Sequence, residues 1–180
     1  MIAQRLPASA VRQCRLQVTG AEPDMTQHAQ RENPPLIRQA SPADHRAWLA
    51  LWGGYQTFYK VSIDDATTAA TWQRLLDDVE PMWCAVAEVD GKPVGIVHFL
   101  THRSTWTAGN YCYLQDLFVD PSLRAKGIGR ALIQYVYARA ADLGCSRVWW
   151  LTHETNAQAM HLYDQVAERS GFIQYRKPLG

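Results

Sequence analysis

Hydrophobic and polar residues change their spacing at one point in the second half of the chain. Residues 111–119 are rich in aromatic and β-branched side chains and are followed by Asp120-Pro121, a pattern that predicts a strand and its end. Between residues 128 and 143, apolar side chains recur three and four positions apart, which predicts a helix with Gly144 as its left-handed stop. The segment 124–130 therefore joins a strand to the start of a helix.

The sequence before residue 111 predicts three strands and two helices. In chain order these are a strand at 36–40, a helix from Pro42, a helix between Asp64 and Asp78, and strands at 82–89 and 94–101. Gly53-Gly54 predicts a bend or break near the first helix. Asp90-Gly91 is a strong signal for a two-residue hairpin turn, so the last two of these strands are expected to pair antiparallel.

A further strand is predicted at 147–151, where residues 148–151 form an almost continuous apolar run typical of a strand covered on both faces. Because a helix connects it to the strand at 111–119, the two strands are expected to be parallel neighbours. A last helix begins near Asn156. The chain therefore predicts a mixed α/β fold, with a largely antiparallel sheet and one central parallel strand-helix-strand unit.

Residues 1–35 differ in composition from the rest of the chain. They contain none of its seven Trp, eight Tyr and four Phe residues, but four of its nine prolines. Such a segment buries too little apolar surface to offset its ordering entropy. We therefore predict a flexible N-terminal tail at 1–35 and one domain at 36–180. Arginines without acids near the start leave an organelle transit peptide as an alternative for the tail.

Composition and charge narrow the class of protein. With 180 residues, 47% hydrophobic and 19% charged, the chain resembles an ordinary globular domain. Its formal net charge of +1 gives no electrostatic argument for a nucleic acid or membrane partner. No apolar run approaches the ~20 residues of a membrane helix, and the start lacks a secretory signal. The four cysteines are widely separated without metal-ligand spacing, so we expect a cytoplasmic protein with no metal site.

The glycine-containing turn has the features of an anion-binding site. Gly127 and Gly129 remove the β-carbons that would keep a phosphate from the backbone, and Arg124 and Lys126 add positive charge. N–H groups at the start of the following helix favour an anion at the same place. A Walker loop is excluded because no Gly-Lys-Ser/Thr follows, and Leu132 stands where a Rossmann fingerprint has its third glycine. A helix start that needs glycine only for packing is the alternative.

This turn, Arg124-x-x-Gly127-x-Gly129, resembles the Arg/Gln-x-x-Gly-x-Gly/Ala pyrophosphate loop of the GNAT superfamily of acyl-CoA N-acyltransferases. Three further segments are similar to that family's fourth strand, its fourth helix and the turn into its last strands: residues 113–119, 156–163 and 171–172. The resemblance covers roughly residues 36–176, and its pattern is nearest to polyamine and histone acetyltransferases.

The resemblance implies an acetyl-CoA-dependent N-acetyltransferase, with acetyl-CoA as co-substrate and no metal. Backbone groups of Leu117, Phe118 and Val119 would hold the pantetheine arm and the thioester carbonyl. The pyrophosphate would lie on the turn, whose residues are Arg124, Ala125, Lys126, Gly127, Ile128, Gly129 and Arg130. Asn156 would meet the pantetheine, although an ordinary N-cap explains an asparagine there equally well.

Tyr163 has two interpretations. It lies on the apolar stripe of the last helix, which alone indicates a core tyrosine. A tyrosine at this position of the family motif usually places its hydroxyl beside the sulfur and acts as general acid, and something must protonate the departing thiolate when acetyl leaves a thioester. The resemblance therefore favours the catalytic role.

Strict alternation divides the strand at 111–119 between two faces: Tyr113, Gln115 and Leu117 on one, and Leu114, Asp116 and Phe118 on the other. Polyamine acetyltransferases of similar pattern carry glutamate at the position of Gln115, and a carboxamide cannot take a proton at neutral pH, so the usual base is missing. Asp116 lies between apolar neighbours, where a carboxylate needs a partner. It is either a structural ion-pair partner or the anchor for the substrate amine, and we assign it to the site.

For the remaining histidines and aromatic residues, a purely structural interpretation competes with a functional one. Four histidines share no metal-ligand spacing and are expected to be packed or on the surface: His98, His102, His153 and His161. Four aromatic residues of the first helix fit either an acceptor cleft or the core: Trp52, Tyr55, Phe58 and Tyr59.

The predicted function is acetyl transfer by direct attack of a primary amine, with a small cationic amine such as a polyamine as acceptor. Acidic residues around the second helix agree with a cationic acceptor, although a solvated helix surface explains them nearly as well: Asp64, Asp65, Asp77, Asp78 and Glu80. A protein lysine as acceptor, a non-catalytic acyl-CoA-binding module and a nucleotide-binding switch are the alternatives. Neither the acceptor nor the oligomeric state, a homodimer included, follows from these residues.

Overall fold

Five strands form a mixed sheet in the order β1-β2-β3-β4-β5 within residues 34–179, the part of the chain that the computed structural model describes. The strands are β1 (Leu36–Gln39), β2 (Met82–Val89), β3 (Lys92–His102), β4 (Tyr111–Val119) and β5 (Arg147–Trp149). The first four are antiparallel neighbours and β5 runs parallel to β4, which confirms the predicted fold class. The tail predicted at 1–35 lies outside the described residues except for its last two positions.

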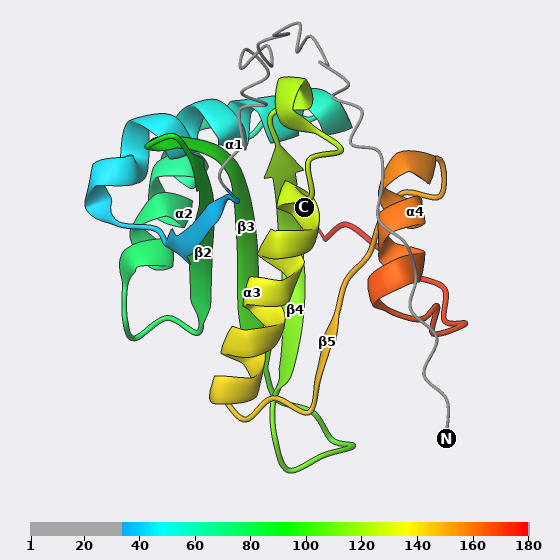
Figure 1. Ribbon diagram of the computed structural model, residues 1–180. Helices are drawn as coiled ribbons and strands as arrows, with labels where there is room; N and C mark the ends of the chain where they lie inside the picture. Colours follow the sequence, from blue (N-terminus) through cyan, green and yellow to red (C-terminus); the bar gives the residue numbers. More distant parts are fainter. Residues whose placement is uncertain (1–33, 180) are drawn as a thin grey trace, which may run out of the picture. The chain divides into compact units, whose positions relative to one another are not determined.

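Helices lie on both faces of this sheet (Figure 1). The helical elements are η1 (Pro42–Asp44), α1 (His45–Tyr59), α2 (Asp65–Leu76), η2 (Pro121–Leu123), α3 (Ile128–Asp142) and α4 (Ala157–Val166). α1 and α2 pack on one face and α3 on the other, which gives the sheet two separate cores. No helix within residues 34–179 is long and apolar enough to cross a membrane.

The two cores differ in composition. On the α3 side, the predicted apolar stripe is buried, and Leu132 and Val136 are both 0% exposed. On the α1 and α2 side, the core is centred on Trp48, whose ring centroid lies 4.7 Å from that of Trp72 and 6.1 Å from that of Trp52. This aromatic core therefore lies directly under α1.

Residues with positive φ mark the turns that the sequence predicted. Asp90 and Gly91 have φ angles of 49° and 74°, as a two-residue type I′ turn between β2 and β3 requires at both positions. Gly144, with a φ of 68°, follows the end of α3. Both turn predictions are confirmed.

The break predicted as one possibility near Gly53-Gly54 does not occur, because α1 continues unbroken to Tyr59. A β-carbon at Gly54 would lie 2.7 Å from Cζ of Phe118 in β4, closer than packed atoms approach. The glycine thus lets α1 lie against the sheet, and this tertiary contact cannot be read from the local sequence. Lys60 caps the end of the helix in the left-handed conformation, with a φ of 55°.

The C-terminal part of the chain contains less strand than expected. β5 has 3 residues and ends at Trp149 instead of residue 151, and none of the described residues after α4 forms a strand. The side chains of Phe172 and Tyr175 are 77% and 89% exposed. The strands expected after Gly171-Phe172 are therefore not formed within the described residues.

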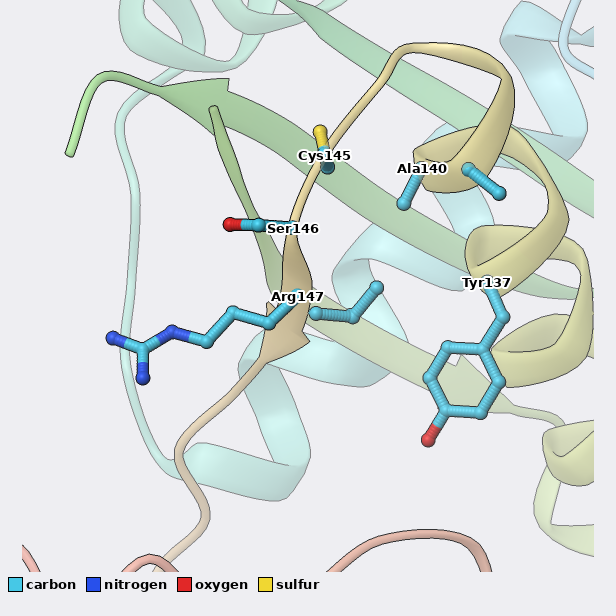
Figure 2. A pocket seen from close by; sticks show the side chains of 7 residues that line it. Tyr137, Ala140, Cys145, Ser146 and Arg147 are labelled. Atoms are coloured by element: carbon cyan, nitrogen blue, oxygen red, sulfur yellow. The ribbon is translucent and has the colours of Figure 1, made fainter. Parts of the chain in front are cut away.

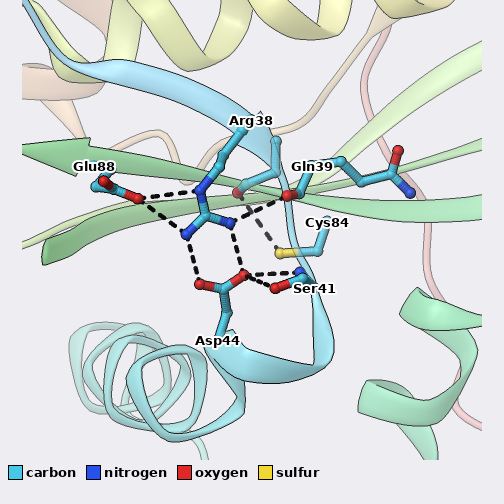
Figure 3. A network of polar contacts seen from close by, with 7 residues as sticks. Arg38, Gln39, Ser41, Asp44, Cys84 and Glu88 are labelled. Carbon is cyan, nitrogen blue, oxygen red and sulfur yellow. Dashed lines mark hydrogen bonds and ion pairs between the residues drawn. The ribbon is translucent and has the colours of Figure 1, made fainter. Parts of the chain in front are cut away.

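Arg38 joins the start of α1 to the sheet (Figure 3). Its Nη1 and Nη2 each donate to the Asp44 carboxylate at 2.7 Å, and its Nε donates to Glu88 Oε2 at 3.1 Å. The Ser41 backbone N–H also donates to Asp44 at 2.8 Å. Asp44 is 5% exposed, and these donors, Arg38 first, lower its pKa to about 2. The network therefore depends on an ionised Asp44.

We expect Asp44→Asn to lower the free energy of unfolding by about 2 kcal/mol at pH 7, because the carboxyl pKa falls from 3.8 to about 2 on folding. A lowered pKa gives stability that is complete above the unfolded value and is lost as the pH falls through the folded one. The difference from wild type should therefore shrink between pH 4 and pH 2, which urea titrations can follow. Glu80→Gln, from an exposed pair 3.9 Å apart, is the control and should change little. A loss in Asp44→Asn that does not depend on pH would contradict this assignment.

Candidate functional site

A β-bulge interrupts the alternation of β4 at Gln115. His98 of β3 lies opposite Asp116, but the next residue, Phe99, lies opposite Leu114, so Gln115 has no partner in the register. Leu114 belongs to the core on the α3 side, whereas Asp116 contacts His98 on the α1 side. The prediction that Leu114 and Asp116 share a face is wrong, because the extra residue shifts the phase of the strand. Gln115 is exposed and Asp116 is buried, so the two side chains lie in different environments.

For much of its length β4 has a strand partner on one side only. It pairs with β3 up to Val119 but with β5 only from Tyr111 to Tyr113, after which the chain of β5 diverges from it (Figure 1). The β5-facing backbone of residues 114–119 has no ladder partner among the described strands. Backbone N–H and C=O groups on such an edge can pair with an extended ligand. The edge includes residues 117–119, to which the resemblance assigns the pantetheine arm.

Two residues with positive φ shape the turn after β4. Ala125 and Gly127 have φ angles of 64° and 79°, and a β-carbon at Gly127 would have no neighbouring atom within 4 Å. The space in front of Gly127 is therefore open, and packing does not explain this glycine. α3 begins at Ile128, and the Ala131 N–H donates to the Gly127 carbonyl at 3.0 Å. The N–H groups of residues 128–130 thus precede the helical ladder and point out of its N-terminal end.

A cavity of about 440 Å³ lies where the open edge of β4, the turn and α4 meet. All predicted coenzyme-binding residues except Lys126 line it, namely Leu117, Phe118, Val119, Arg124, Ala125, Gly127, Ile128, Gly129, Arg130, Asn156 and Tyr163. Lys126 and Asp116 are not among the lining residues. The described lining carries two arginines and no carboxylate, so the cavity favours an anionic ligand.

The two arginines of the turn make different contacts. The Arg124 guanidinium lies 5.4 Å from the ring centroid of Phe58 and 6.0 Å from that of Phe118, so its charge rests on the aromatic wall of the cavity. Arg130 Nη2 donates to Gln165 Oε1 and so links the start of α3 to α4. Both side chains hold positive charge at the mouth of the turn.

Tyr163 and Asn156 each fit both of their predicted interpretations. The Tyr163 ring packs edge-on against Trp150, with centroids 5.3 Å apart, yet Tyr163 also lines the cavity. Burial, and to a smaller extent the nearby Tyr59, raises the pKa of Tyr163 to about 12. Asn156 caps α4 by accepting from the Ala159 N–H at 3.3 Å, and it too lines the cavity.

Asp116 lies beneath α1 in a buried polar chain. Its Oδ2 is 3.0 Å from His98 Nδ1, and His98 Nε2 is 2.8 Å from Trp48 Nε1. The prediction of a packed histidine is confirmed for His98, but its bond to Asp116 was not predicted, since it depends on the register of β3 against β4. Burial first, and then the charge of Asp116, raises the pKa of Tyr55 far above its usual range.

The four aromatic residues of α1 that fit either an acceptor cleft or the core divide between core and cavity. Trp52 is 5% exposed and belongs to the core, whereas Phe58 and Tyr59 line the cavity. Tyr55 lies between them, with its ring centroid 5.1 Å from that of Trp52 and 4.8 Å from that of Tyr59. The core interpretation is therefore confirmed for Trp52, whereas an acceptor cleft at Phe58 and Tyr59 stays a prediction.

The model of the acetyltransferase (GNAT) family matches residues 27–167 of the chain. This protein belongs to the GNAT family. It is therefore an N-acetyltransferase, and the family uses acetyl-CoA as co-substrate. The expectation of an enzyme is confirmed. The cavity between β4, the turn and α4 is the candidate coenzyme site.

Two GNAT relatives and one solved structure illustrate the match. The chain is 34% identical over 144 residues to a D-amino-acid N-acetyltransferase of Saccharomyces cerevisiae, which covers 79% of this chain and 89% of the relative. It is 31% identical over 159 residues to an aminoglycoside N(6')-acetyltransferase type 1 of Stenotrophomonas maltophilia, which covers 81% and 94%. The structure of an aminoglycoside acetyltransferase from an uncultured soil metagenomic sample shares the fold, with a TM-score of 0.69 at 21% identity over 82% of this chain and 98% of that one.

A second hollow, of about 290 Å³, lies between α3 and β5 of the GNAT fold (Figure 2). Its polar side chains are already engaged: the Tyr137 hydroxyl donates to the Val166 carbonyl at 2.8 Å, and the Arg147 guanidinium lies 3.8 Å from the ring centroid of Tyr111. Figure 2 shows the Arg147 side chain extending away from Tyr137, whose ring extends down from α3, so these two polar groups do not converge on one point. Within residues 34–179, no group of three or more His, Cys, Asp or Glu side chains is arranged to hold a metal ion.

We expect Gly127→Val to weaken CoA binding by about tenfold or more, because a side chain there would fill the open space in front of the backbone N–H groups. Gly91→Val is a matched control, since Gly91 has a similar φ of 74° and likewise no atom within 4 Å of an added β-carbon. Both variants should lose similar stability, and only the first should lose affinity in calorimetric titrations with CoA. Unchanged CoA affinity in folded Gly127→Val would remove the turn from the coenzyme site.

Proposed function

We propose that this GNAT enzyme transfers the acetyl group of acetyl-CoA to a primary amine of a small cationic molecule, by direct attack of the amine on the thioester. The observation that carries the proposal is the 440 Å³ cavity, where a strand edge without ladder partners, an anion-binding turn and a tyrosine meet. The described lining contains no Cys, Ser or Thr side chain that could carry the acetyl group itself, which supports direct transfer.

The chemistry of the turn suits the pyrophosphate of acetyl-CoA. The N–H groups that begin α3 and the positive end of the helix dipole favour an anion in front of Gly127. Arg124 and Arg130 add charge at the same cavity. The open edge of β4 offers backbone partners to the amide groups of the pantetheine arm, so the reactive thioester would lie toward α4 and Tyr163.

Tyr163 serves in this proposal as the donor to the departing sulfur. A pKa of about 12 keeps its hydroxyl protonated throughout the neutral range, which is the state a donor requires. The hydroxyl is not needed to bind the coenzyme before the C–S bond breaks. Its contribution should therefore be confined to the chemical step.

Tyr163→Phe should lower kcat by about 100-fold and leave the KM for acetyl-CoA nearly unchanged, as steady-state kinetics can show. Because the pKa of Tyr163 is raised to about 12, loss of the donor should cause no fall in wild-type kcat below pH ~10. Tyr137→Phe is the control, since its hydroxyl donates to the Val166 carbonyl. A kcat like that of wild type in Tyr163→Phe would leave Tyr163 as a core residue.

Asp116 is proposed to place the cationic acceptor. The Asp116 carboxylate contacts the ring of His98, which has a neutral form, and it lies close to Tyr55. Neither neighbour therefore carries a permanent positive charge. The named relatives act on D-amino acids and aminoglycosides, which are small molecules with amino groups. Gln115 is exposed at the bulge and cannot accept a proton, so water is left to carry the amine's proton away.

A panel of amines tests this proposal. An alkyl amine with a pKa near ~10 is mostly charged at pH 7 and must lose a proton before attack, so without a tuned base kcat/KM should rise toward the pKa of the amine itself. With a less basic amine, this rising limb of the pH profile should move to lower pH by as much as the pKa of the amine is lower. The rates are measured as thiol release from acetyl-CoA. No turnover with any amine of the panel would contradict the proposed function.

Asp116→Asn should weaken acceptor binding by about tenfold and leave the position of the limb unchanged. Asp64→Asn, which changes an exposed acid at the start of α2, is the control for general attraction of cations and should have little effect. If the limb lies near neutral pH for every amine and disappears in Asp116→Asn, then Asp116 is the base and not an anchor.

A further inference from the structure

Beneath α1, three side chains from three elements form a hydrogen-bonded series, of which only Asp116 has a part in the proposed acetyl transfer. Trp48 comes from α1, His98 from β3 and Asp116 from β4, and their residues are 0%, 3% and 7% exposed. We propose that Trp48 locks His98 in one neutral tautomer, and that this lock keeps Asp116 an uncompensated anion for the ammonium group of the acceptor. Trp48 and His98 are thus positioning residues, and this inference rests on the proposed role of Asp116.

The tautomer follows from the chemistry of the donors. An indole N–H can only donate, so the 2.8 Å contact from Trp48 Nε1 requires an unprotonated His98 Nε2. A neutral imidazole must then carry its proton on Nδ1, which donates to Asp116 Oδ2 at 3.0 Å. A second proton on Nε2 would point at the indole N–H, with no acceptor in that direction. Trp48 therefore opposes formation of a cationic His98.

Burial makes the lock effective. Water has little access to His98 or Trp48, so it cannot replace the indole as a partner for Nε2. If His98 took a second proton, its charge would compensate Asp116 at 3.0 Å, and the carboxylate would attract an ammonium less strongly. With the lock in place, the buried carboxylate has only neutral donors among its described neighbours and needs a cation from outside.

The other titratable groups around the pair do not supply that cation. They are His45 and Tyr55 of α1, Cys84 of β2, and Tyr113 of β4, with Asp44 beyond Cys84. Burial, with the charge of Asp116 as a further cause, raises the pKa of Tyr55, Tyr113 and Cys84, which keeps all three neutral. The His45 ring packs against Trp48, with ring centroids 6.2 Å apart.

Trp52 offers a matched control on the same helix. It lies one turn after Trp48, its ring centroid is 5.2 Å from that of His98, and it is 5% exposed. Its Nε1 has no hydrogen-bond partner within the described residues. Trp52→Phe therefore removes a buried indole beside His98 without removing the bond that defines the lock.

Nitrogen-15 spectra of the histidine side chains test the tautomer directly. The His98 signals are assigned as those that are missing from the spectra of His98→Asn. In the wild-type protein we expect them to show the Nδ1–H form from pH 8 to pH 5.5. In Trp48→Phe, His98 should become doubly protonated toward pH 5.5, and in Trp52→Phe it should behave as in wild type. An Nε2–H or doubly protonated His98 in wild-type protein would overturn the lock, and this result does not require any variant to fold.

Acceptor affinity tests the consequence. A trimethylammonium analogue of the best acceptor carries a permanent charge. The pH dependence of its inhibition constant therefore reports the titration of groups on the enzyme. If the analogue does not inhibit, the acceptor KM is measured instead. For Trp48→Phe we expect about a tenfold loss of affinity between pH 8 and pH 5.5, because without the indole donor His98 can take a second proton that compensates Asp116. Wild type and Trp52→Phe should stay nearly flat, and the KM for acetyl-CoA should not follow this pH dependence. The double variant Trp48→Phe/His98→Asn should be flat again, because asparagine can donate to Asp116 but cannot be protonated.

The two measurements separate this inference from the proposed function. If the spectra show the lock and its loss in Trp48→Phe, but acceptor affinity is flat in every variant, the lock serves only the core and the inference is wrong. Acetyl transfer to the amine panel could still proceed in that case. If no amine turns over at all, the proposed function fails, whatever the state of His98.

Discussion

The divergence of β4 from β5 is the constraint on which the rest of the site depends. β4 is paired along β3 to its last residue, so its position is fixed, while its other edge loses its ladder after Tyr113. Unpaired backbone groups inside a protein are costly, which means that an extended ligand or water must satisfy them. The same divergence leaves room for the turn and α4 to close a cavity around that edge. In the proposed function, coenzyme binding therefore depends on sheet geometry more than on side chains.

The bulge at Gln115 lets one strand serve two purposes. Before it, Leu114 faces the core under α3, and directly after it Asp116 faces the aromatic core under α1. Without the extra residue, Asp116 and Leu114 would share a face, and the carboxylate would lie among the apolar side chains that support α3. The bulge thus places a buried carboxylate one residue from the backbone edge that lines the cavity.

Local patterns predicted the elements, and tertiary contacts account for what they missed. The period-2 and period-3.6 stretches, the Asp90-Gly91 turn and the stop at Gly144 are properties of short segments, and all are present. The unbroken α1 depends on Phe118 packing against Gly54, and the partner of Asp116 depends on the register between two strands. The residues that line the cavity were predicted from the family resemblance, because spacing alone does not show that segments about 40 residues apart in the sequence meet in space.

Gln115 and Asp116 together suggest how this enzyme separates charge recognition from proton removal. The position that carries glutamate in similar polyamine acetyltransferases holds an exposed amide here, and the adjacent carboxylate is buried with a hydrogen bond from His98. The hydrogen bond from His98 fixes the orientation of the Asp116 carboxylate. In the proposed mechanism such a site selects acceptors by their positive charge and leaves deprotonation to water, so its efficiency depends on how readily each amine gives up its proton. The same arrangement needs a neutral His98, because a cationic ring there would satisfy the carboxylate without any acceptor.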